Sequence, residues 1–180
     1  ILDLGCGGGI ASEPLCRLGA NLTGVDESKK LIEVAKLHAK NMKLQINYQC
    51  TSIENLIKFK NKYDVIIALE LLEHVNNLKQ FCKLITNLLN ENGIIILSTI
   101  NKTFLSKLFV IDMAEKILKK IPKGTHHYEK FINPTEIKDI FNNYNFHIKT
   151  IKGMNLNPIN NNWKLTNNTS INYIVSLSKY

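Results

Sequence analysis

Glycines and a carboxylate stand near the start of the chain at a spacing that suits ligand binding. Gly5, Gly7 and Gly9 alternate, and Asp3 lies two residues before Gly5. Glycine lets the backbone pass close to a ligand in conformations closed to other residues. A dinucleotide-binding loop has the pattern G-x-G-x-x-G, and its third glycine would fall at Ile10. This departure, with an acid ahead of the loop, favours S-adenosylmethionine (SAM), because the ammonium group of SAM attracts a carboxylate that a pyrophosphate would repel.

A second acid stands where the ribose of that cofactor would bind. Asp26 follows a predicted strand over 21–25, and ligands of open α/β sheets bind at the carboxyl ends of the strands. The alternative role for Asp26 is a helix N-cap just before Ser28. Ser52 is predicted to reach the adenine edge, and Leu69 to lie beside the cofactor. The predicted cofactor-binding residues are Asp3, Gly5, Gly7, Asp26, Ser52 and Leu69.

Further polar side chains suit activation of a hydroxyl group. Glu70, Glu73 and His74 follow a predicted strand over 63–69 at i, i+3 and i+4, so on a helical turn they would share one face. They are candidate metal ligands, with Glu70 and His74 also candidate catalytic residues. The alternative is that the helix dipole alone favours acids in a first turn. His126 is the third catalytic candidate, as a base with a pKa of roughly 6.5, unless it is an ordinary exposed loop histidine.

Apolar runs alternate with stretches of helical periodicity along the chain, as in a parallel sheet with crossover helices. The order predicts an α/β, Rossmann-like fold with seven strands, mainly parallel with the last antiparallel, and helices on both faces. The predicted strands are 1–4, 21–25, 45–50, 63–69, 94–99, 146–153 and 171–178, and the predicted helices are 11–18, 28–42, 78–89 and 133–143.

Finer features follow from the same patterns. Glu91–Gly93 is predicted to be a turn, and the Asn-rich stretch 155–168 a loop. The strand 63–69 is expected to be buried on both faces, because Val, Ile, Ile and Ala follow one another in it. In helix 28–42 the apolar spacing predicts a buried stripe, made up of Leu31, Val34, Ala35 and Ala39.

Residues 104–121 form a long amphipathic stretch where this fold needs only a short connection. We therefore expect a helical insertion at about 102–130 within one domain that spans 1–180. The default role of such a helix is a lid packed on the domain. The alternative is contact with an anionic membrane interface, since its polar face carries lysines, at Lys116, Lys119 and Lys120. Because the chain opens inside an apolar run, we also expect that a natural segment precedes it.

The composition narrows the function classes. The 180 residues are 44% hydrophobic and 21% charged, which is typical of one globular domain. The formal charge of +8 comes from lysine, since Arg17 is the only arginine, and this argues against nucleic-acid recognition. Biased codon usage and an anionic membrane surface are the two remaining explanations of the charge. The four cysteines form no C-x-x-C pair, which predicts neither a zinc site nor a disulfide framework, and favours a reducing compartment.

Several motifs together resemble the ubiquinone biosynthesis O-methyltransferases, a family of class I SAM-dependent methyltransferases. The first motif, Ile-Leu-Asp-Leu-Gly-Cys-Gly-Gly-Gly at 1–9, is shared across the superfamily. The more specific motifs are Glu-Leu-Leu-Glu-His-Val at 70–75, Ser-Thr-Ile-Asn-Lys-Thr at 98–103, Pro-Lys-Gly-Thr-His at 122–126, Asn-Pro-Ile at 157–159, Trp-Lys-Leu at 163–165 and Asn-Tyr at 172–173.

The resemblance implies methyl transfer from SAM to a phenolic hydroxyl on a ring with a polyprenyl tail. It places the family's cofactor contacts on Gly5, Asp26 and Leu69, and adds Mg²⁺ as a second cofactor at residues 70–75. It also implies peripheral membrane contact, a quinone-synthesis complex, and either a bacterial cytoplasm or the matrix face of the mitochondrial inner membrane. The alternatives are methylation of another small molecule, including on carbon, and a scaffold that binds SAM without catalysis.

Overall fold

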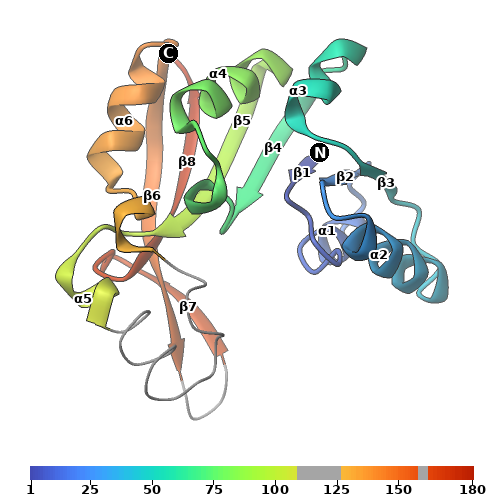
Figure 1. Ribbon diagram of the computed structural model, residues 1–180, viewed down its shortest axis with the longest axis horizontal. Helices are drawn as coiled ribbons and strands as arrows, with labels where there is room; N and C mark the ends of the chain where they lie inside the picture. The colour runs from blue at the N-terminus through green and yellow to red at the C-terminus, as the bar shows by residue number, and fades with distance from the viewer. Residues whose placement is uncertain (109–126, 158–161) are drawn as a thin grey trace. The chain divides into compact units, whose positions relative to one another are not determined.

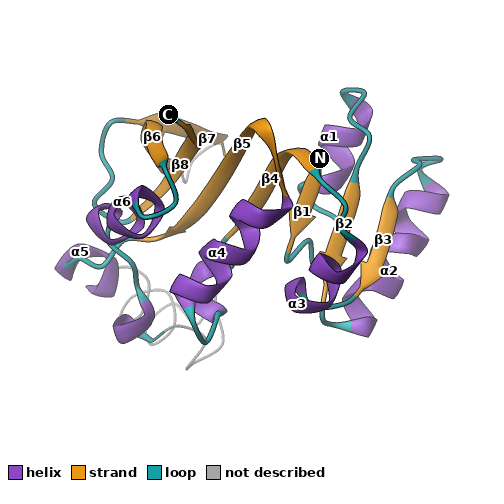
Figure 2. Cartoon of the chain, turned by 90° about the horizontal axis from the view of Figure 1, so that it is seen from above, coloured by secondary structure: helices purple, strands orange, loops and turns teal. Residues whose placement is uncertain are grey.

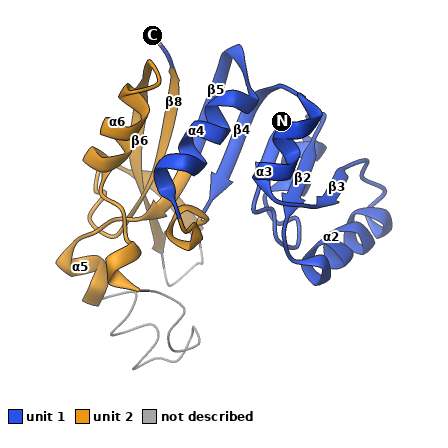
Figure 3. Cartoon of the chain, turned by 45° about the horizontal axis from the view of Figure 1, so that its top comes forward, with its two compact units in different colours: residues 1–69, 77–96, 179 blue, residues 70–76, 97–178, 180 orange. Residues whose placement is uncertain are grey.

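The computed structural model describes residues 1–108, 127–157 and 162–180 of the chain. These residues divide into two compact units, shown in different colours in Figure 3. Unit 1 comprises residues 1–69, 77–96 and 179, and unit 2 comprises residues 70–76, 97–178 and 180. The insertion predicted at about 102–130 falls largely on residues 109–126, outside the described residues.

Unit 1 is built around parallel strands (Figure 1). Their order is β3-β2-β1-β4, so the strand that precedes the glycine loop lies between two neighbours. In register, Leu2 pairs with Thr23 on one side and with Ile66 on the other. The strands are β1 (Leu2–Leu4), β2 (Thr23–Asp26), β3 (Asn47–Cys50), β4 (Tyr63–Leu69) and β5 (Leu89–Ile100), the last of which continues into unit 2.

Helices cover both faces of these strands, as predicted, with α1 and α2 on one side and α3 and α4 on the other (Figure 2). Two of them begin at an N-cap whose side chain accepts a backbone hydrogen bond: Ser28 Oγ accepts the N–H of Leu31, and Asn77 Oδ1 accepts the N–H of Gln80. The helices are α1 (Ser12–Arg17), α2 (Lys29–Asn41), α3 (Ile53–Leu56), followed by the 3₁₀ turn Ile57–Phe59, and α4 (Leu78–Leu88).

The face that α2 buries differs from the predicted stripe. Ala35 and Ala39 are buried as expected, but Leu31 and Val34 are 42% and 50% exposed. Ile32 is buried in their place and packs with Ala35 and Ala39 against Cys6 and Tyr48. Apolar residues stand on both sides of this helix, so the sequence pattern alone could not fix its rotation about its axis. The prediction for β4 is confirmed at its centre, where residues 66–68 are fully buried.

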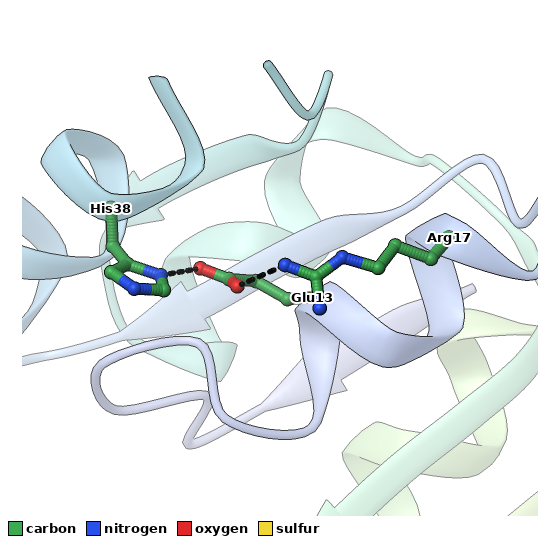
Figure 4. A network of polar contacts seen from close by, with 3 residues as sticks. All are labelled: Glu13, Arg17 and His38. Carbon is green, nitrogen blue, oxygen red and sulfur yellow. Dashed lines mark hydrogen bonds and ion pairs between the residues drawn. The ribbon is translucent and has the colours of Figure 1, made fainter. Parts of the chain in front are cut away.

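An ion network ties α1 to α2 (Figure 4). Glu13 is 6% exposed, and its carboxylate accepts a hydrogen bond from Arg17 Nη2 at 3.3 Å and lies 2.5 Å from His38 Nδ1. The Glu13 N–H donates to Gly9 O at 3.0 Å. The helix that follows the glycine loop is therefore fastened both to the loop and to the neighbouring helix.

Unit 2 carries the C-terminal antiparallel strands and an aromatic core. β6 and β7 pair antiparallel, and the strand order is β8-β6-β7. Four large aromatic side chains are fully buried, namely Phe131, Phe141, Phe146 and Tyr173. The elements are the 3₁₀ turn η2 (Leu72–His74), α5 (Phe104–Ser106), η4 (Tyr128–Lys130), α6 (Pro134–Asn142), β6 (Phe146–Asn157), β7 (Asn162–Thr166) and β8 (Asn172–Lys179). In the described part of the chain, no helix is long and apolar enough to cross a bilayer.

The described residues form eight strands where seven were predicted. β7 lies inside the stretch predicted to be an Asn-rich loop. The prediction failed because the many asparagines on either side outweighed the alternating residues Trp-Lys-Leu-Thr, which form the strand. The turn predicted at 91–93 is also wrong, since β5 runs through it. A Cβ atom on Gly93 would lie 2.5 Å from Leu89 Cγ and 2.9 Å from the Asp64 carbonyl oxygen. This glycine therefore marks a close approach of the backbone rather than a turn.

Candidate cofactor and catalytic site

The glycine loop follows β1 and is fixed to the end of β2. The N–H groups of Gly5 and Cys6 both donate to Val25 O, at 2.8 and 3.0 Å. Gly7 has a φ of +52° and Gly9 a φ of +87°, which side chains disfavour. A Cβ atom on Gly7 would meet nothing within 4 Å, whereas one on Gly9 would lie 2.2 Å from the Tyr48 hydroxyl. Gly7 therefore borders open space, and Gly9 is required by packing.

Asp26 holds this loop through its carboxylate. Its Oδ2 accepts the Gly7 N–H at 3.0 Å, and its Oδ1 accepts the Ser28 N–H at 2.8 Å. The N-cap of α2 is Ser28, so Asp26 does not cap that helix. A carboxylate has about four lone-pair sites, so the two bonds leave acceptor capacity for the hydroxyls of a ribose.

Asp3 is the buried acid of the site. It is 2% exposed, and its Oδ2 accepts a hydrogen bond from Ser12 Oγ at 2.6 Å. Burial raises the pKa of Asp3 to about 6, the charge of Asp26 adds to the rise, and the Ser12 bond opposes it. Burial, Asp3 and Asp26 together raise the pKa of the Cys6 thiol to about 12. The loop thus lies in a negative field, which attracts an ammonium or sulfonium group and repels a pyrophosphate.

The structure brings the six predicted cofactor residues to one edge of the parallel strands. Ser52 is half-buried two residues after β3, and the intervening Thr51 donates its N–H to Asp26 O at 3.1 Å. Leu69 is the half-buried last residue of β4, whose Ala68 pairs with Leu4 of β1. Parallel strands end at the same edge, so the loop, Asp26, Ser52 and Leu69 all border the region in which open α/β sheets bind ligands.

The acidic segment after β4 belongs to unit 2 and differs from its prediction. Glu70 has a φ of +51° and lies before the 3₁₀ turn Leu72–His74, so Glu70, Glu73 and His74 do not share a helical face. The shared face required a helical turn over 70–74, and the left-handed Glu70 interrupts helical periodicity before the 3₁₀ turn begins. Glu73 is buried, whereas His74 is exposed.

Two adjacent hydroxyls on β5 hold these acids. Ser98 Oγ accepts the Glu70 N–H at 3.0 Å and donates to Glu70 Oε1 at 2.7 Å. Thr99 Oγ1 donates to Glu73 Oε2 at 2.7 Å, and this pair is fully buried. Successive side chains of a strand point to opposite faces, so the two carboxylates are anchored from opposite faces of β5.

The three candidate metal ligands, Glu70, Glu73 and His74, are therefore not gathered around one point. Within 1–108, 127–157 and 162–180, no three His, Cys, Asp or Glu side chains form a group able to hold a metal ion. The anchoring of Glu70 and Glu73 to opposite faces accounts for this physically, and His74 does not complete a three-ligand set with them.

The remaining catalytic candidate, His126, lies outside the described residues, whereas its neighbour His127 is exposed and precedes η4.

Sequence reasoning missed four residues that shape the site, namely Ser12, Tyr48, Ser98 and Thr99. Tyr48 is 3% exposed, and burial raises its pKa to about 12. The only sequence signal for any of the four was the Ser-Thr pair that opens the motif 98–103.

A glycine loop between parallel strands, with carboxylates before it and at the next strand's end, defines a SAM-dependent methyltransferase of the Rossmann-like α/β class. The methyltransferase domain family model matches residues 2–97. The magnesium protoporphyrin IX methyltransferase of Synechocystis, solved with bound S-adenosylhomocysteine (SAH), has a TM-score of 0.73 at 23% identity, over 99% of this chain and 73% of that one. A SAM-dependent methyltransferase of Clostridium acetobutylicum has a TM-score of 0.71 at 18% identity, over 99% and 82%. These two likenesses show the fold.

The chain belongs to the ubiquinone biosynthesis O-methyltransferase family. The family member of Pelagibacter ubique is 51% identical over 179 residues, which cover 99% of this chain and 74% of that protein. The Rickettsia typhi protein is 46% identical, over 99% of this chain and 72% of that protein. The mitochondrial protein of Arabidopsis thaliana is 42% identical over 175 residues, which cover 96% of this chain and 54% of that protein.

Proposed function

We propose that this chain transfers a methyl group from SAM to a phenolic hydroxyl of a polyprenylated ubiquinone precursor. It is a SAM-dependent O-methyltransferase of ubiquinone biosynthesis by its close kinship to that family. The observation that carries the cofactor assignment is the glycine loop in the negative field of Asp3 and Asp26. We further propose that residues 1–180 work as one methyltransferase domain.

The cofactor assignment gives each residue of unit 1 a role. Asp26 would accept the ribose hydroxyls, while Gly5 and Gly7 would let the amino acid part of SAM approach the backbone. Asp3 would balance the ammonium charge from its buried position, and a bound cation would lower the pKa of Asp3 again. Ser52 would contact the adenine and Leu69 the cofactor's apolar side.

Methyl transfer is an in-line displacement at carbon, so the protein has to align donor and acceptor and remove the hydroxyl proton. We propose Glu70 and His126 as the candidates for that proton acceptor, with His74 as a third. Glu70 follows the cofactor residue Leu69 directly in the chain, and the Ser98 hydroxyl fixes its Oε1. A His126→Ala variant that binds SAH normally and keeps full turnover would remove His126 from the proposal.

Magnesium is a separate part of the proposal, and the described residues fit it poorly as a set of three ligands. Mg²⁺ commonly takes only one or two carboxylates and completes its shell with water. Of Glu70, Glu73 and His74, the exposed Glu70 suits such a hydrated ion best. Titration with Mg²⁺ alone tests this directly. Binding that Glu70→Gln abolishes would support the metal, and no heat change with the unaltered chain would remove it.

The substrate class suggests contact with a membrane and with other enzymes of quinone synthesis. We propose that residues 104–121 contact an anionic interface with their lysine face. Liposome flotation tests this, with charge reversal at Lys116, Lys119 and Lys120. The relatives are bacterial or mitochondrial, so a membrane-peripheral place in a bacterial cytoplasm or at the mitochondrial inner membrane fits the proposal.

The decisive experiment supplies the chain with SAM and a catechol that carries a short prenyl tail, and follows methyl transfer by mass spectrometry. O-methylated product confirms the proposal, whereas methylation on ring carbon favours the alternative of a carbon methyltransferase. Binding of SAH without transfer to any phenol would favour the non-catalytic scaffold. SAH affinity is measured in the same preparation, so that a misfolded sample is not mistaken for an inactive one.

A further inference from the structure

The Tyr48 side chain of β3 is buried against the glycine loop and carries an unpartnered hydroxyl. Tyr48 is 3% exposed, and among the described residues its hydroxyl oxygen has no hydrogen-bond partner. A Cβ atom on Gly9 would lie 2.2 Å from that oxygen, so the hydroxyl packs directly against the loop. A buried hydroxyl without a partner costs free energy, and folded proteins contain few such groups. Its position beside the cofactor loop therefore calls for a functional explanation.

The strand register directs the Tyr48 ring toward the buried acid of the site. Asp3 of β1 pairs with Gly24 of β2, and Gly24 pairs with Tyr48 of β3. Directly paired residues point to the same side of a sheet. A Cβ atom on Gly24 would lie 2.6 Å from two carbon atoms of the Tyr48 ring. The ring thus crosses the sheet over Gly24, on the side that carries the Asp3 carboxylate.

Ser12 lies between the two groups in hydrogen-bonding terms. Burial raises the pKa of Tyr48 to about 12, and the neighbouring Ser12 hydroxyl opposes that rise. Ser12 is itself fully buried, and its Oγ donates to Asp3 Oδ2 at 2.6 Å. A hydroxyl oxygen can accept a hydrogen bond while it donates its own proton. Ser12 Oγ can therefore accept the Tyr48 O–H and keep its bond to Asp3.

Acidic groups around Tyr48 keep its proton in place, so it can act only as a donor toward Ser12. Cys6, Glu13 and Asp3 all add to the rise in the pKa of Tyr48 that burial causes. The other titratable or charged groups around the pair are Asp26, which acts on Asp3, and Arg17 and His38, which contact Glu13.

We propose that Tyr48 is a positioning residue for cofactor binding, and that its O–H holds the Ser12 hydroxyl in the orientation that donates to Asp3. Hydrogen bonds in a chain polarise one another, so a proton from Tyr48 makes Ser12 a stronger donor. A stronger donor favours the ionised form of Asp3, which attracts the ammonium group of the cofactor. This proposal rests on the role of Asp3 in the proposed function, and Tyr48 itself touches neither SAM nor the substrate.

Tyr48→Phe tests the hydroxyl alone, since it keeps the ring that packs against Cys6 and Ala35. Calorimetry gives the affinity for SAH and for methylthioadenosine, which has no ammonium group, at pH 5 and pH 7. We expect the variant to bind SAH about threefold more weakly at pH 5 and almost normally at pH 7. The reason is that the ionisation of Asp3 moves upward by about half a pH unit. Methylthioadenosine binding should not change.

Two further variants flank this test. Ser12→Ala should shift the same ionisation by about one pH unit, because it removes the hydrogen bond to Asp3 itself. Tyr63→Phe is the matched control, since Tyr63 begins β4 and so lies at the edge of the parallel strands opposite the loop. It should bind both ligands as the unaltered chain does at both pH values.

The outcomes separate this proposal from the proposed function. Equal weakening of SAH and methylthioadenosine by Tyr48→Phe at both pH values would overturn it in favour of packing, and unchanged SAH binding would overturn it outright. A pH dependence that Glu13→Gln removes would assign the ionisation to Glu13 and His38 instead. Asp3→Asn should weaken SAH binding and abolish its pH dependence. Normal SAH binding by Asp3→Asn would remove the proposed role of Asp3 as well, whereas weak binding by Asp3→Asn with normal binding by Tyr48→Phe would remove Tyr48 alone.

Discussion

Asp26 of unit 1 and the two glutamates that follow β4 in unit 2 are held in different ways. In unit 1, Asp26 accepts hydrogen bonds from two backbone N–H groups, those of Gly7 and Ser28. In unit 2, Glu70 and Glu73 accept hydrogen bonds from side-chain hydroxyls, those of Ser98 and Thr99. A carboxylate held by backbone keeps its partners whatever the neighbouring side chains are. A hydrogen bond from a hydroxyl instead needs one particular side chain, Ser98 for Glu70 and Thr99 for Glu73, and each of these is open to substitution.

Substitution of Asp3 should change the free energy of unfolding most, because burial makes ionisation of its carboxyl group unfavourable. Below its ordinary pKa of 3.8 the carboxyl is protonated both folded and unfolded, and folding then carries no cost from its ionisation. Above about pH 6 it must ionise in a buried place, which costs at most about 3 kcal/mol, since one pKa unit is about 1.4 kcal/mol. Asp3→Asn should therefore raise the free energy of unfolding by up to about 3 kcal/mol at pH 8 and change it little at pH 4.

Urea unfolding at the two pH values measures this effect. The exposed Asp139 of α6 offers a control, since Asp139→Asn should change stability equally little at both. An Asp3→Asn effect of the same size at pH 4 and pH 8 would show that ionisation of Asp3 is not the cause. The same variant should bind SAM more weakly. The two measurements would then show that Asp3 lowers the stability of the fold but strengthens cofactor binding.

Asp26→Ala should weaken SAH binding about 100-fold, because hydrogen bonds to a charged group contribute roughly 1.5–3 kcal/mol each. The substitution frees the Gly7 N–H and removes the proposed ribose acceptor together. Isothermal titration calorimetry gives the affinity, and Asp26→Asn, which retains one acceptor oxygen, should lose less. Unchanged SAH affinity in Asp26→Ala would mean that the loop does not need its carboxylate.

Ser98→Ala should lower kcat about tenfold, since it removes a hydrogen bond of roughly 1.5 kcal/mol to the charged Glu70. Because Ser98 acts through Glu70, SAH affinity should stay within about twofold of the unaltered chain. Ser98→Thr keeps the hydroxyl and should restore turnover. A loss of kcat that Ser98→Thr does not restore would point to packing instead of the hydroxyl.

Glu13 gives the smallest effect and a third way of holding an acid, by the Arg17 guanidinium and the His38 imidazole. Glu13→Gln should lower the free energy of unfolding by about 1 kcal/mol, because Arg17 and His38 are each half exposed and water weakens their interactions with Glu13. Thermal and urea unfolding measure the change, with the exposed Glu33→Gln as control. A Glu13→Gln variant as stable as the control would mean that the network in Figure 4 adds nothing to stability.

Much of unit 1 could be predicted from the sequence, since its signals are local. The strands β1, β2 and β4 and the helices α2 and α4 follow from apolar runs and caps a few residues apart, as does α6 in unit 2. The rotation of α2 and the strand β7 could not be predicted in this way. Leu31 and Val34 are as apolar as the residues that α2 buries, and only the sheet decides which side faces inwards.

The glycine loop and the position of Asp26 could be read from local spacing, because each lies within its own strand-turn-helix unit. What each acid contacts depends on the folded chain. Ser98 and Glu70 are 28 residues apart in the sequence, too far for a local sequence pattern to link them. Their hydrogen bond depends on how distant segments of the chain come together. The same holds for the pairing of β6 with β7, since Leu156 and Trp163 share a side only through the register of the two strands. Register is set by long-range packing, and no short sequence motif encodes it.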